Sequence, residues 1–208
     1  MTNSRLKIVI VGAGQNSTVV ANILSLKKGN KIIGFLDDVK KGKHILGPVK
    51  DYKKFIGRHS FFISFGDNRF RKNIFNQMKK AGAKFASAIH PTAAIEKNVV
   101  LGDNVMIGAL SYININTVIG DNTFINNGCI IEHDNKIGSH NHITPGVVTA
   151  GEVTIKDGVF IGIGSTIRDR TVVAKNCFIG ASSNVVANTE PNSMYYGNPA
   201  KLVKSYDV

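Results

Sequence analysis

The chain of 208 residues has no tryptophan, two cysteines and five prolines. Two cysteines are too few for a disulfide framework or a cysteine-rich metal site. The sequence also contains no run of 18 apolar residues, and its first residues lead into a strand pattern rather than a secretory signal. We therefore expect a soluble, cytoplasmic protein that does not insert into a membrane.

Acidic residues are also scarce, and their distribution divides the chain. Residues 1–88 contain 18 Lys and Arg against 4 Asp and Glu, whereas residues 89–208 contain 8 against 10. A basic segment of this kind often binds an anionic partner, whether nucleic acid, a membrane surface or a phosphorylated small molecule. The alternative is that these lysines only solvate the surface. The few aromatic residues and the lack of a groove-reading motif argue against nucleic acid.

An aliphatic residue recurs at every sixth position from Ile89 to Val185, and Thr149 is the one exception. A period of six belongs neither to a helix nor to a continuous strand, and it is the signature of a parallel β-helix. The position two residues before each aliphatic, which we call the inward slot, is small or β-branched through most of the run and includes Cys129 and Cys177. We interpret both cysteines as reduced core residues, and three hexapeptides as one triangular coil.

Glycine often follows the aliphatic residue, where we expect a tight bend with positive φ or a close backbone approach. These glycines are Gly102, Gly108, Gly120, Gly138, Gly162 and Gly180. The sequence thus predicts three segments: an N-terminal domain over residues 1–88, a β-helix over 89–190 and a tail over 191–208.

The first segment alternates strands and helices. Apolar runs over 6–11, 31–36 and 60–65 predict strands, and residues 17–26 and 69–80 predict helices. This alternation predicts a small parallel sheet with helices on its faces. The predicted fold class is therefore a Rossmann-like α/β domain with a small parallel sheet over residues 1–88, followed by a parallel β-helix.

Ligands of such sheets lie beyond the carboxyl ends of the strands. The candidate residues there are Gly12, Gly14, Asp37, Asp38, Gly66 and Asn68. Backbone N–H groups of the first loop can contact phosphate, and a carboxylate after the second strand can bind a ribose or a base edge. A dinucleotide fingerprint would need glycine at position 17, where this chain has Ser17, so a mononucleotide is the better hypothesis. The alternative is that these glycines serve only turns.

The hexapeptide pattern is richest in chemistry around Glu132, His133 and Asp134, followed by His140 and His142. A neutral imidazole can accept a proton from an amine or hydroxyl that attacks a thioester, and a neighbouring carboxylate can orient it. Three histidines could instead bind a metal, but their spacing fits no tetrahedral template, and we expect none. An ordinary surface cluster is the remaining alternative.

In domain order and motifs the whole chain resembles the bacterial nucleotide-sugar N-acetyltransferases and sialic-acid O-acetyltransferases with hexapeptide repeats. The matching stretches are residues 9–14, 35–38, 66–68, 90–91, 126–134, 142–151 and 197–201. The resemblance implies that the β-helix is left-handed and that the protein is a homotrimer, with acetyl-coenzyme A bound between neighbouring copies.

The resemblance also implies roles for individual residues. His133 would be the catalytic base, Asp134 its partner, and Asn126 would position the sugar amine. The acetyl-coenzyme A contacts would be His142, the backbone N–H of Gly151 as an oxyanion donor, and Lys201 near the phosphates.

In the nucleotide-sugar site the relatives often have histidine where this chain has Asn16. The resemblance therefore implies acetyl transfer from acetyl-coenzyme A to the amino group of a nucleotide-linked amino-dideoxy sugar, of the 4-amino-4,6-dideoxy type, for surface glycan or O-antigen synthesis. The alternatives are an O-acetyltransferase for sialic acid or a related sugar, and a non-catalytic nucleotide-binding scaffold. The nucleotide is not specified.

Overall fold

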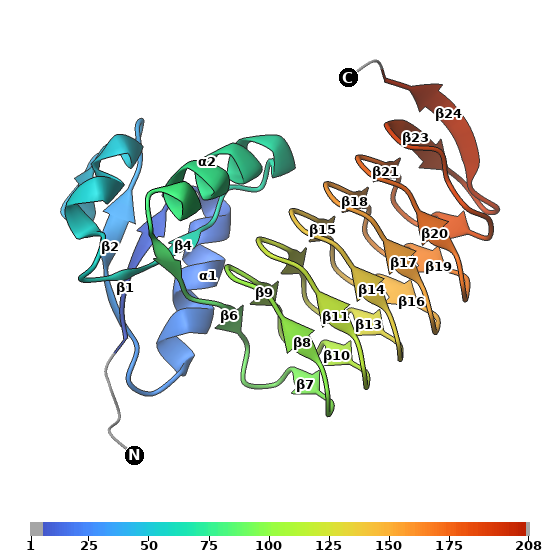
Figure 1. The fold of residues 1–208 in the computed structure, drawn as a ribbon, viewed down its shortest axis with the longest axis horizontal. Coiled ribbons are helices and arrows are strands. Elements are labelled where there is room, and N and C mark those ends of the chain that lie inside the picture. The colour runs from blue at the N-terminus through green and yellow to red at the C-terminus, as the bar shows by residue number, and fades with distance from the viewer. Residues whose placement is uncertain (1–5, 207–208) are drawn as a thin grey trace. The chain divides into compact units, whose positions relative to one another are not determined.

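The computed structural model describes residues 6–206 and divides the chain into two compact units, Met1–Pro91 and Thr92–Val208 (Figure 1). Among the described residues, no helix combines the length and apolar character needed to cross a membrane.

The N-terminal unit is built on a parallel sheet of five strands within the described residues, in the order β3-β2-β1-β4-β5. Its elements are β1 (Lys7–Val11), α1 (Gln15–Leu26), β2 (Lys31–Leu36), β3 (Ile45–Gly47), the 3-10 helix η1 (Val49–Phe55), β4 (Ser60–Ile63), α2 (Asn68–Lys80) and β5 (Lys84–Phe85). The four residues from Ile8 to Val11 are all buried, so both faces of β1 are covered, as in parallel sheets flanked by helices. The predicted strands and helices are present, although α1 begins two residues earlier than predicted and β4 ends two residues earlier.

Beyond residue 87 the described chain forms short strands, most of them of two residues, which are joined by turns and arranged in three sheets. One sheet contains β7 (Ala94–Ile95), β10 (Tyr112–Ile113), β13 (Ile130–Ile131), β16 (Val148–Thr149), β19 (Thr166–Ile167) and β22 (Asn184–Val185). The next contains β8 (Val100–Leu101), β11 (Val118–Ile119), β14 (Lys136–Ile137), β17 (Thr154–Ile155) and β20 (Val172–Val173). The third contains β6 (Ala88–Ile89), β9 (Met106–Ile107), β12 (Phe124–Ile125), β15 (His142–Ile143), β18 (Phe160–Ile161), β21 (Phe178–Ile179), β23 (Ser193–Tyr196) and β24 (Lys201–Ser205).

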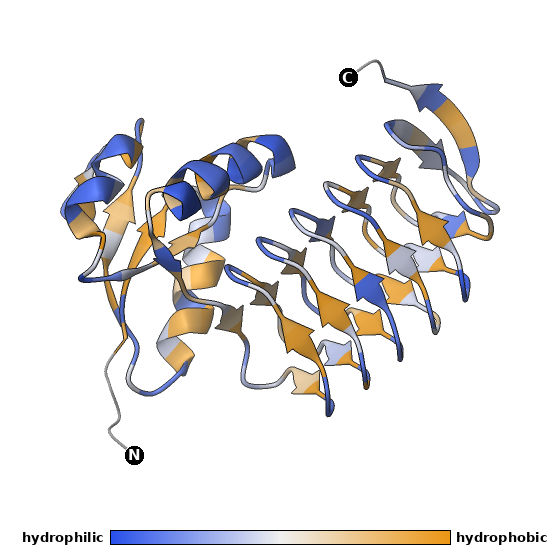
Figure 2. Cartoon of the chain, viewed as in Figure 1, coloured by the Kyte–Doolittle hydropathy of each residue, from blue (hydrophilic) through white to orange (hydrophobic). Residues whose placement is uncertain are grey.

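Each strand of the coils pairs in parallel with the strand 18 residues later, so that Ile113 pairs with Ile131 and Ile131 with Thr149. Three hexapeptides therefore complete one coil, as predicted. The aliphatic series is buried from Ile107 to Val185. Figure 2 shows the apolar strands alternating with hydrophilic turns along the unit. Since burying one Ile side chain contributes about 1.5–3 kcal/mol, this buried column stabilises the coils.

The turns follow the same period as the strands. Positive φ recurs every six residues, at positions that include Asn116, Asn122, Gly128 and Asp134. The glycines that follow the aliphatic residues do not have positive φ, so that half of the expectation is wrong for them. They instead allow close backbone approach: a Cβ atom on Gly162 would lie 2.5 Å from the backbone N of Ala181.

The predicted fold class, an α/β domain with a small parallel sheet followed by a left-handed parallel β-helix, is confirmed. Both Cys129 and Cys177 are free and buried, as their place in the inward slot predicts.

Candidate functional site

The β-helix carries a histidine–carboxylate pair on the turn that links β13 to β14. We call residues 132–135 the His133 turn. Nδ1 of His133 lies 2.8 Å from Oδ2 of Asp134, and about half of each side chain is exposed, 49% and 47% respectively. An ionised carboxylate only accepts hydrogen bonds, so in the neutral imidazole Nδ1 carries the proton and Nε2 has the lone pair.

Asp134 has a second donor from the preceding coil. Nδ2 of Asn116 donates to Oδ1 of Asp134 at 3.1 Å, and Asn116 is itself bonded by Asn98 18 residues earlier. The hydrogen bond from His133, followed by the bond from Asn116, holds the pKa of Asp134 below its usual value. Asp134 therefore remains ionised and fixes the orientation of the imidazole.

Gly151 lies directly beside the imidazole of His133, one coil later. A Cβ atom on Gly151 would lie 2.6 Å from both Cε1 and Nε2 of His133. Glycine is therefore required for the ring to occupy this place, and the position leaves the backbone near Nε2 uncovered. Of the residues predicted for the β-helix site, the structure brings His133, Asp134 and Gly151 together.

The other predicted residues of the β-helix lie elsewhere in a single copy of the chain. Asn126 follows β12 at a different corner of the coil, and its Oδ1 accepts a hydrogen bond from the Asn127 N–H at 2.9 Å. His142 is 9% exposed on the outer side of β15, with ring contacts to Phe124 and Phe160 at 5.9 and 5.4 Å. The exposed Lys201 begins β24.

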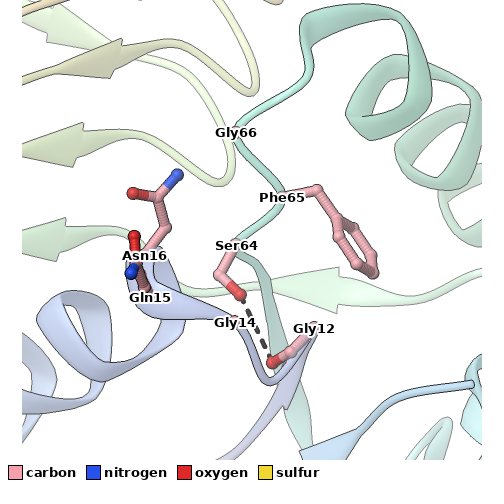
Figure 3. Close-up of a pocket in the computed structure, with 7 residues that line it drawn as sticks. All are labelled: Gly12, Gly14, Gln15, Asn16, Ser64, Phe65 and Gly66. Atoms are coloured by element: carbon pink, nitrogen blue, oxygen red, sulfur yellow. Dashed lines mark hydrogen bonds between the residues drawn. The ribbon is translucent and has the colours of Figure 1, made fainter. Parts of the chain in front are cut away.

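A cavity of about 250 Å³ lies at the carboxyl ends of β1 and β4, where ligand binding was predicted (Figure 3). It is lined by Gly12, Gly14, Gln15, Asn16, Ser64, Phe65 and Gly66. Gly12 has φ +102°, and a Cβ atom there would lie 2.9 Å from Oγ of Ser64. A Cβ atom on Gly66 would lie 2.8 Å from Nδ2 of Asn16. The glycines thus keep the cavity open, and Asn16 brings an amide group to its edge.

The two carboxylates after β2 hold the loops around the cavity and do not line it. Asp37 accepts hydrogen bonds from the backbone N–H of Ala13 at 2.7 Å and of Val39 and Lys40 at 2.9 and 2.8 Å. Burial acts to raise the pKa of Asp37, but these N–H groups outweigh it and the pKa lies below its usual value. Asp38 accepts from the N–H of Val49 at 2.8 Å.

A buried arginine, which the sequence analysis did not single out, holds the loop after β4. Arg71 on α2 donates to the carbonyl oxygens of Phe65 and Gly66 at 2.9 and 3.2 Å, and to Oδ1 of Asn68 at 2.9 Å. Burial lowers the pKa of Arg71 to about 9, against the opposing charge of Asp67. Asn68 is thereby part of the support of this loop.

The cavity is also lined by three residues that no sequence pattern indicated: Gln15, Ser64 and Phe65.

No group of three or more His, Cys, Asp or Glu side chains is placed to hold a metal ion within the described part of the chain. The three histidines for which a metal cluster was the alternative make other contacts: Nδ1 of His133 bonds Asp134, the ring of His142 contacts Phe124 and Phe160, and Nδ1 of His140 lies 2.9 Å from Nδ2 of Asn122.

Two family descriptions match the chain. Residues 7–78 match the PglD N-terminal domain, and residues 82–165 match the GMPPB C-terminal domain. A curated relative, a probable macrolide acetyltransferase from Lysinibacillus sphaericus, is 41% identical over 54 residues, which are 26% of this chain and 30% of that protein. The match therefore spans less than a third of that relative.

Solved structures match nearly the whole chain. A histidine-to-asparagine mutant of perosamine N-acetyltransferase from Caulobacter crescentus, in complex with CoA and GDP-perosamine, has 26% identity and a TM-score of 0.91, covering 96% of this chain and 97% of that one. The acetyltransferase domain of PglB from Neisseria gonorrhoeae, in complex with acetyl coenzyme A, also has 26% identity and a TM-score of 0.91, covering 96% and 100%. The resemblance predicted from the sequence is confirmed by these matches.

Proposed function

We propose that this chain, a hexapeptide-repeat sugar acetyltransferase that uses acetyl-coenzyme A, acetylates the amino group of a nucleotide-linked amino-dideoxy sugar. We assign it to a cytoplasmic step of surface glycan synthesis and take the sugar to be of the 4-amino-4,6-dideoxy type. The solved relative with GDP-perosamine supports an acceptor of this class.

The observation that carries the proposal is the geometry around Nε2 of His133. Oδ2 of Asp134 lies 2.8 Å from Nδ1 of the ring. On the other side of the ring, a Cβ atom at position 151 would lie 2.6 Å from Cε1 and Nε2, so only glycine leaves room there. A general base must reach the proton that it removes, either directly or through one water. An exposed, oriented imidazole beside an open glycine backbone meets this condition.

The reaction then proceeds by direct attack. The sugar amine attacks the thioester carbonyl carbon and a C–N bond forms, while His133 Nε2 takes the proton that the nitrogen loses. The C–S bond breaks, and the coenzyme A thiolate leaves and takes up a proton. Asp134 stabilises the imidazolium, and the N–H of Gly151 is proposed as a donor to the oxygen of the tetrahedral intermediate.

The nucleotide portion of the acceptor is assigned to the cavity of the N-terminal unit. Its glycine loop can donate backbone N–H groups to a diphosphate, and the amide of Asn16 can bond a base or ribose. The excess of Lys and Arg over residues 1–88, 18 against 4 acidic residues, favours an anionic ligand there. His142 and Lys201 are proposed as acetyl-coenzyme A contacts, and Asn126 as a contact to the sugar amine, from a neighbouring copy of a homotrimer.

The test is release of free thiol from acetyl-coenzyme A in the presence of nucleotide-linked amino sugars. We expect turnover with an amino sugar, and none with the same sugar carrying a hydroxyl in place of the amine. Turnover with sialic acid alone would indicate O-acetylation, and no turnover with any acceptor would indicate a binding scaffold.

His133→Ala is expected to lower kcat by about 10²–10⁴-fold and to leave acetyl-coenzyme A binding nearly unchanged, because only the base is removed. Calorimetric titration of the variant with coenzyme A checks the second part. Unchanged turnover would remove His133 from the mechanism.

A further inference from the structure

One buried polar side chain connects the His133 turn to the coil that carries Gly151. Asn135 is 0% exposed and occupies the inward slot, which holds small or apolar side chains in the other hexapeptides except at Asn141. Its Nδ2 donates to the carbonyl oxygens of Glu132, His133 and Ala150 at 2.7, 3.3 and 2.9 Å. Two of these bonds therefore close the His133 turn on itself, and the third reaches the residue before Gly151.

The bond to Ala150 is the ordinary bond of the inward slot. Thr117, one coil earlier at the same corner, donates to the carbonyl oxygen 15 residues ahead at 3.1 Å. Ser111, Thr123 and Ser165 make the same bond at 2.8, 2.9 and 2.8 Å. The bonds from Asn135 to Glu132 and His133 are additional: hydroxyls in the slot approach the carbonyl two residues earlier only at 3.5 Å, as in Thr123 and Thr171.

Coil stability alone does not account for an asparagine at this position. Oδ1 of Asn135 is buried and has no hydrogen-bond partner among the described residues, which disfavours the folded state. Val99 and Val153, in the same slot one coil or two away, fill the corner without any polar atom. Asn135 is thus less favourable for packing than its neighbours in the column, and its two additional bonds act on the His133 turn.

We infer that Asn135 is a positioning residue, which holds the backbone of His133 at the spacing from Gly151 that the acetyl transfer requires. The carbonyl oxygen of His133 also accepts from the N–H of Glu152 at 3.0 Å, so both the next coil and Asn135 fix it. A backbone held on both sides restricts where Nε2 can lie. This inference rests on the proposed role of His133 as the base.

The decisive variant is Asn135→Thr, which has a similar volume and retains a hydroxyl for the bond to Ala150. It loses the bonds to Glu132 and His133. We expect kcat to fall by about 10–100-fold, because misplacement of a catalytic group by about 1 Å slows the reaction strongly, and both KM values to stay within about twofold of the wild type.

The matched control is Asn141→Thr. Asn141 occupies the next inward slot, where Nδ2 bonds Gly138 O at 3.0 Å and Oδ1 accepts from the Val159 N–H at 2.7 Å.

The control should retain kcat at saturating concentrations of both substrates, and the unfolding midpoints of the two variants should be similar. Asn135→Val, which copies Val153, provides a second variant if the threonine variant does not fold. Wild-type kcat in a folded Asn135 variant, or equal loss of kcat in Asn141→Thr, would overturn the inference. His133→Ala is assayed in parallel: if it is inactive while Asn135→Thr is fully active, only the role of Asn135 fails, whereas an active His133→Ala contradicts the proposed function itself.

Discussion

In the proposed mechanism, the carboxylate of Asp134 determines which nitrogen of His133 is available to the substrate. His133 and Asn116 both donate to it, at 2.8 and 3.1 Å, so an amide at this position must turn its NH₂ group toward one of two donors. Asp134→Asn therefore disturbs the tautomer and removes the charge that stabilises the imidazolium. We expect kcat to fall by about 10²–10³-fold, measured by thiol release. Asp169→Asn, an exposed carboxylate two coils away, is the control and should retain activity.

The His133–Asp134 pair also predicts how kcat depends on pH. Because its hydrogen bonds from His133 and Asn116 hold the pKa of Asp134 below its usual value, the carboxylate is ionised throughout the range in which an imidazole titrates. Activity that depends on a neutral imidazole is lost as pH falls, and Asp134 contributes no second proton in that range. The acid limb of log kcat against pH should have a slope of one. A slope of two would show that a second group must also be deprotonated.

The thiols provide an independent check on the core. Burial raises the pKa of Cys129 to about 11, and burial also raises the pKa of Cys177. A raised pKa means less thiolate, about one part in a thousand for Cys129 at pH 8. Neither thiol should react with a disulfide reagent in the native protein, and both should react in denaturant. Rapid reaction of the native protein would contradict the inward orientation.

At the scale of the coil, two kinds of glycine are distinguished by what surrounds them. Gly162 has the backbone atoms Ala181 N and Gly180 C at 2.5 and 2.6 Å from an added Cβ, whereas Gly128 has φ +66° and nothing within 4 Å. Gly162→Ala should destabilise the protein by about 3 kcal/mol or more, because backbone cannot move aside as a side chain can. Gly128→Asn should cost less than about 0.5 kcal/mol, since asparagine tolerates positive φ.

Urea unfolding at one fixed protein concentration compares the two variants with the wild type, because subunit association would otherwise alter the midpoint. Equal destabilisation by both substitutions would contradict the distinction between close backbone contact at Gly162 and open space with positive φ at Gly128.

The coils also show why some features could be predicted from the sequence and others could not. A period of six specifies which side chains face inward, so the burial of Ile107 to Val185 followed from spacing alone. Ile95 at the start of the series is still 37% exposed, because a coil at the end of a stack is covered on one side only. The pairing of His133 with Asp134 could also be predicted from the sequence, since the two residues are adjacent.

The hydrogen bonds that support the two sites could not be predicted from the sequence. Whether Asn135 bonds the carbonyl of Ala150 depends on the rise and twist of the coil, which no composition or period records. Asp37 was predicted as a ligand contact from its place after a strand, and the structure shows its oxygens bonded to Ala13, Val39 and Lys40. A carboxylate beside a glycine loop can accept hydrogen bonds either from nearby backbone N–H groups or from a ligand. The sequence does not show which of these two roles it has.

At the scale of the whole molecule, one copy of the chain presents its predicted residues on different surfaces. His133 lies on the turn between β13 and β14, whereas His142 lies on β15 in another sheet. The outer faces of the sheets also carry exposed apolar side chains, with Val100, Val118 and Ile130 at 58%, 44% and 40% exposed. Both observations favour a site completed by a second copy, and we expect light scattering to give three times the chain mass of 22.5 kDa.

If each site takes His133 from one copy and His142 from its neighbour, two inactive variants should restore each other. His133→Ala and His142→Ala, each trimeric and each nearly inactive alone, are co-expressed in equal amounts. In a ring of three with random mixing, one interface in four joins an intact His133 to an intact His142, so activity should recover to about a quarter of the wild type. Because His142 is 9% exposed, the mass and unfolding midpoint of its variant are measured first. Mixtures that stay as inactive as their parents would mean that both histidines act from the same copy, and a monomeric wild type would leave no second copy to complete the site.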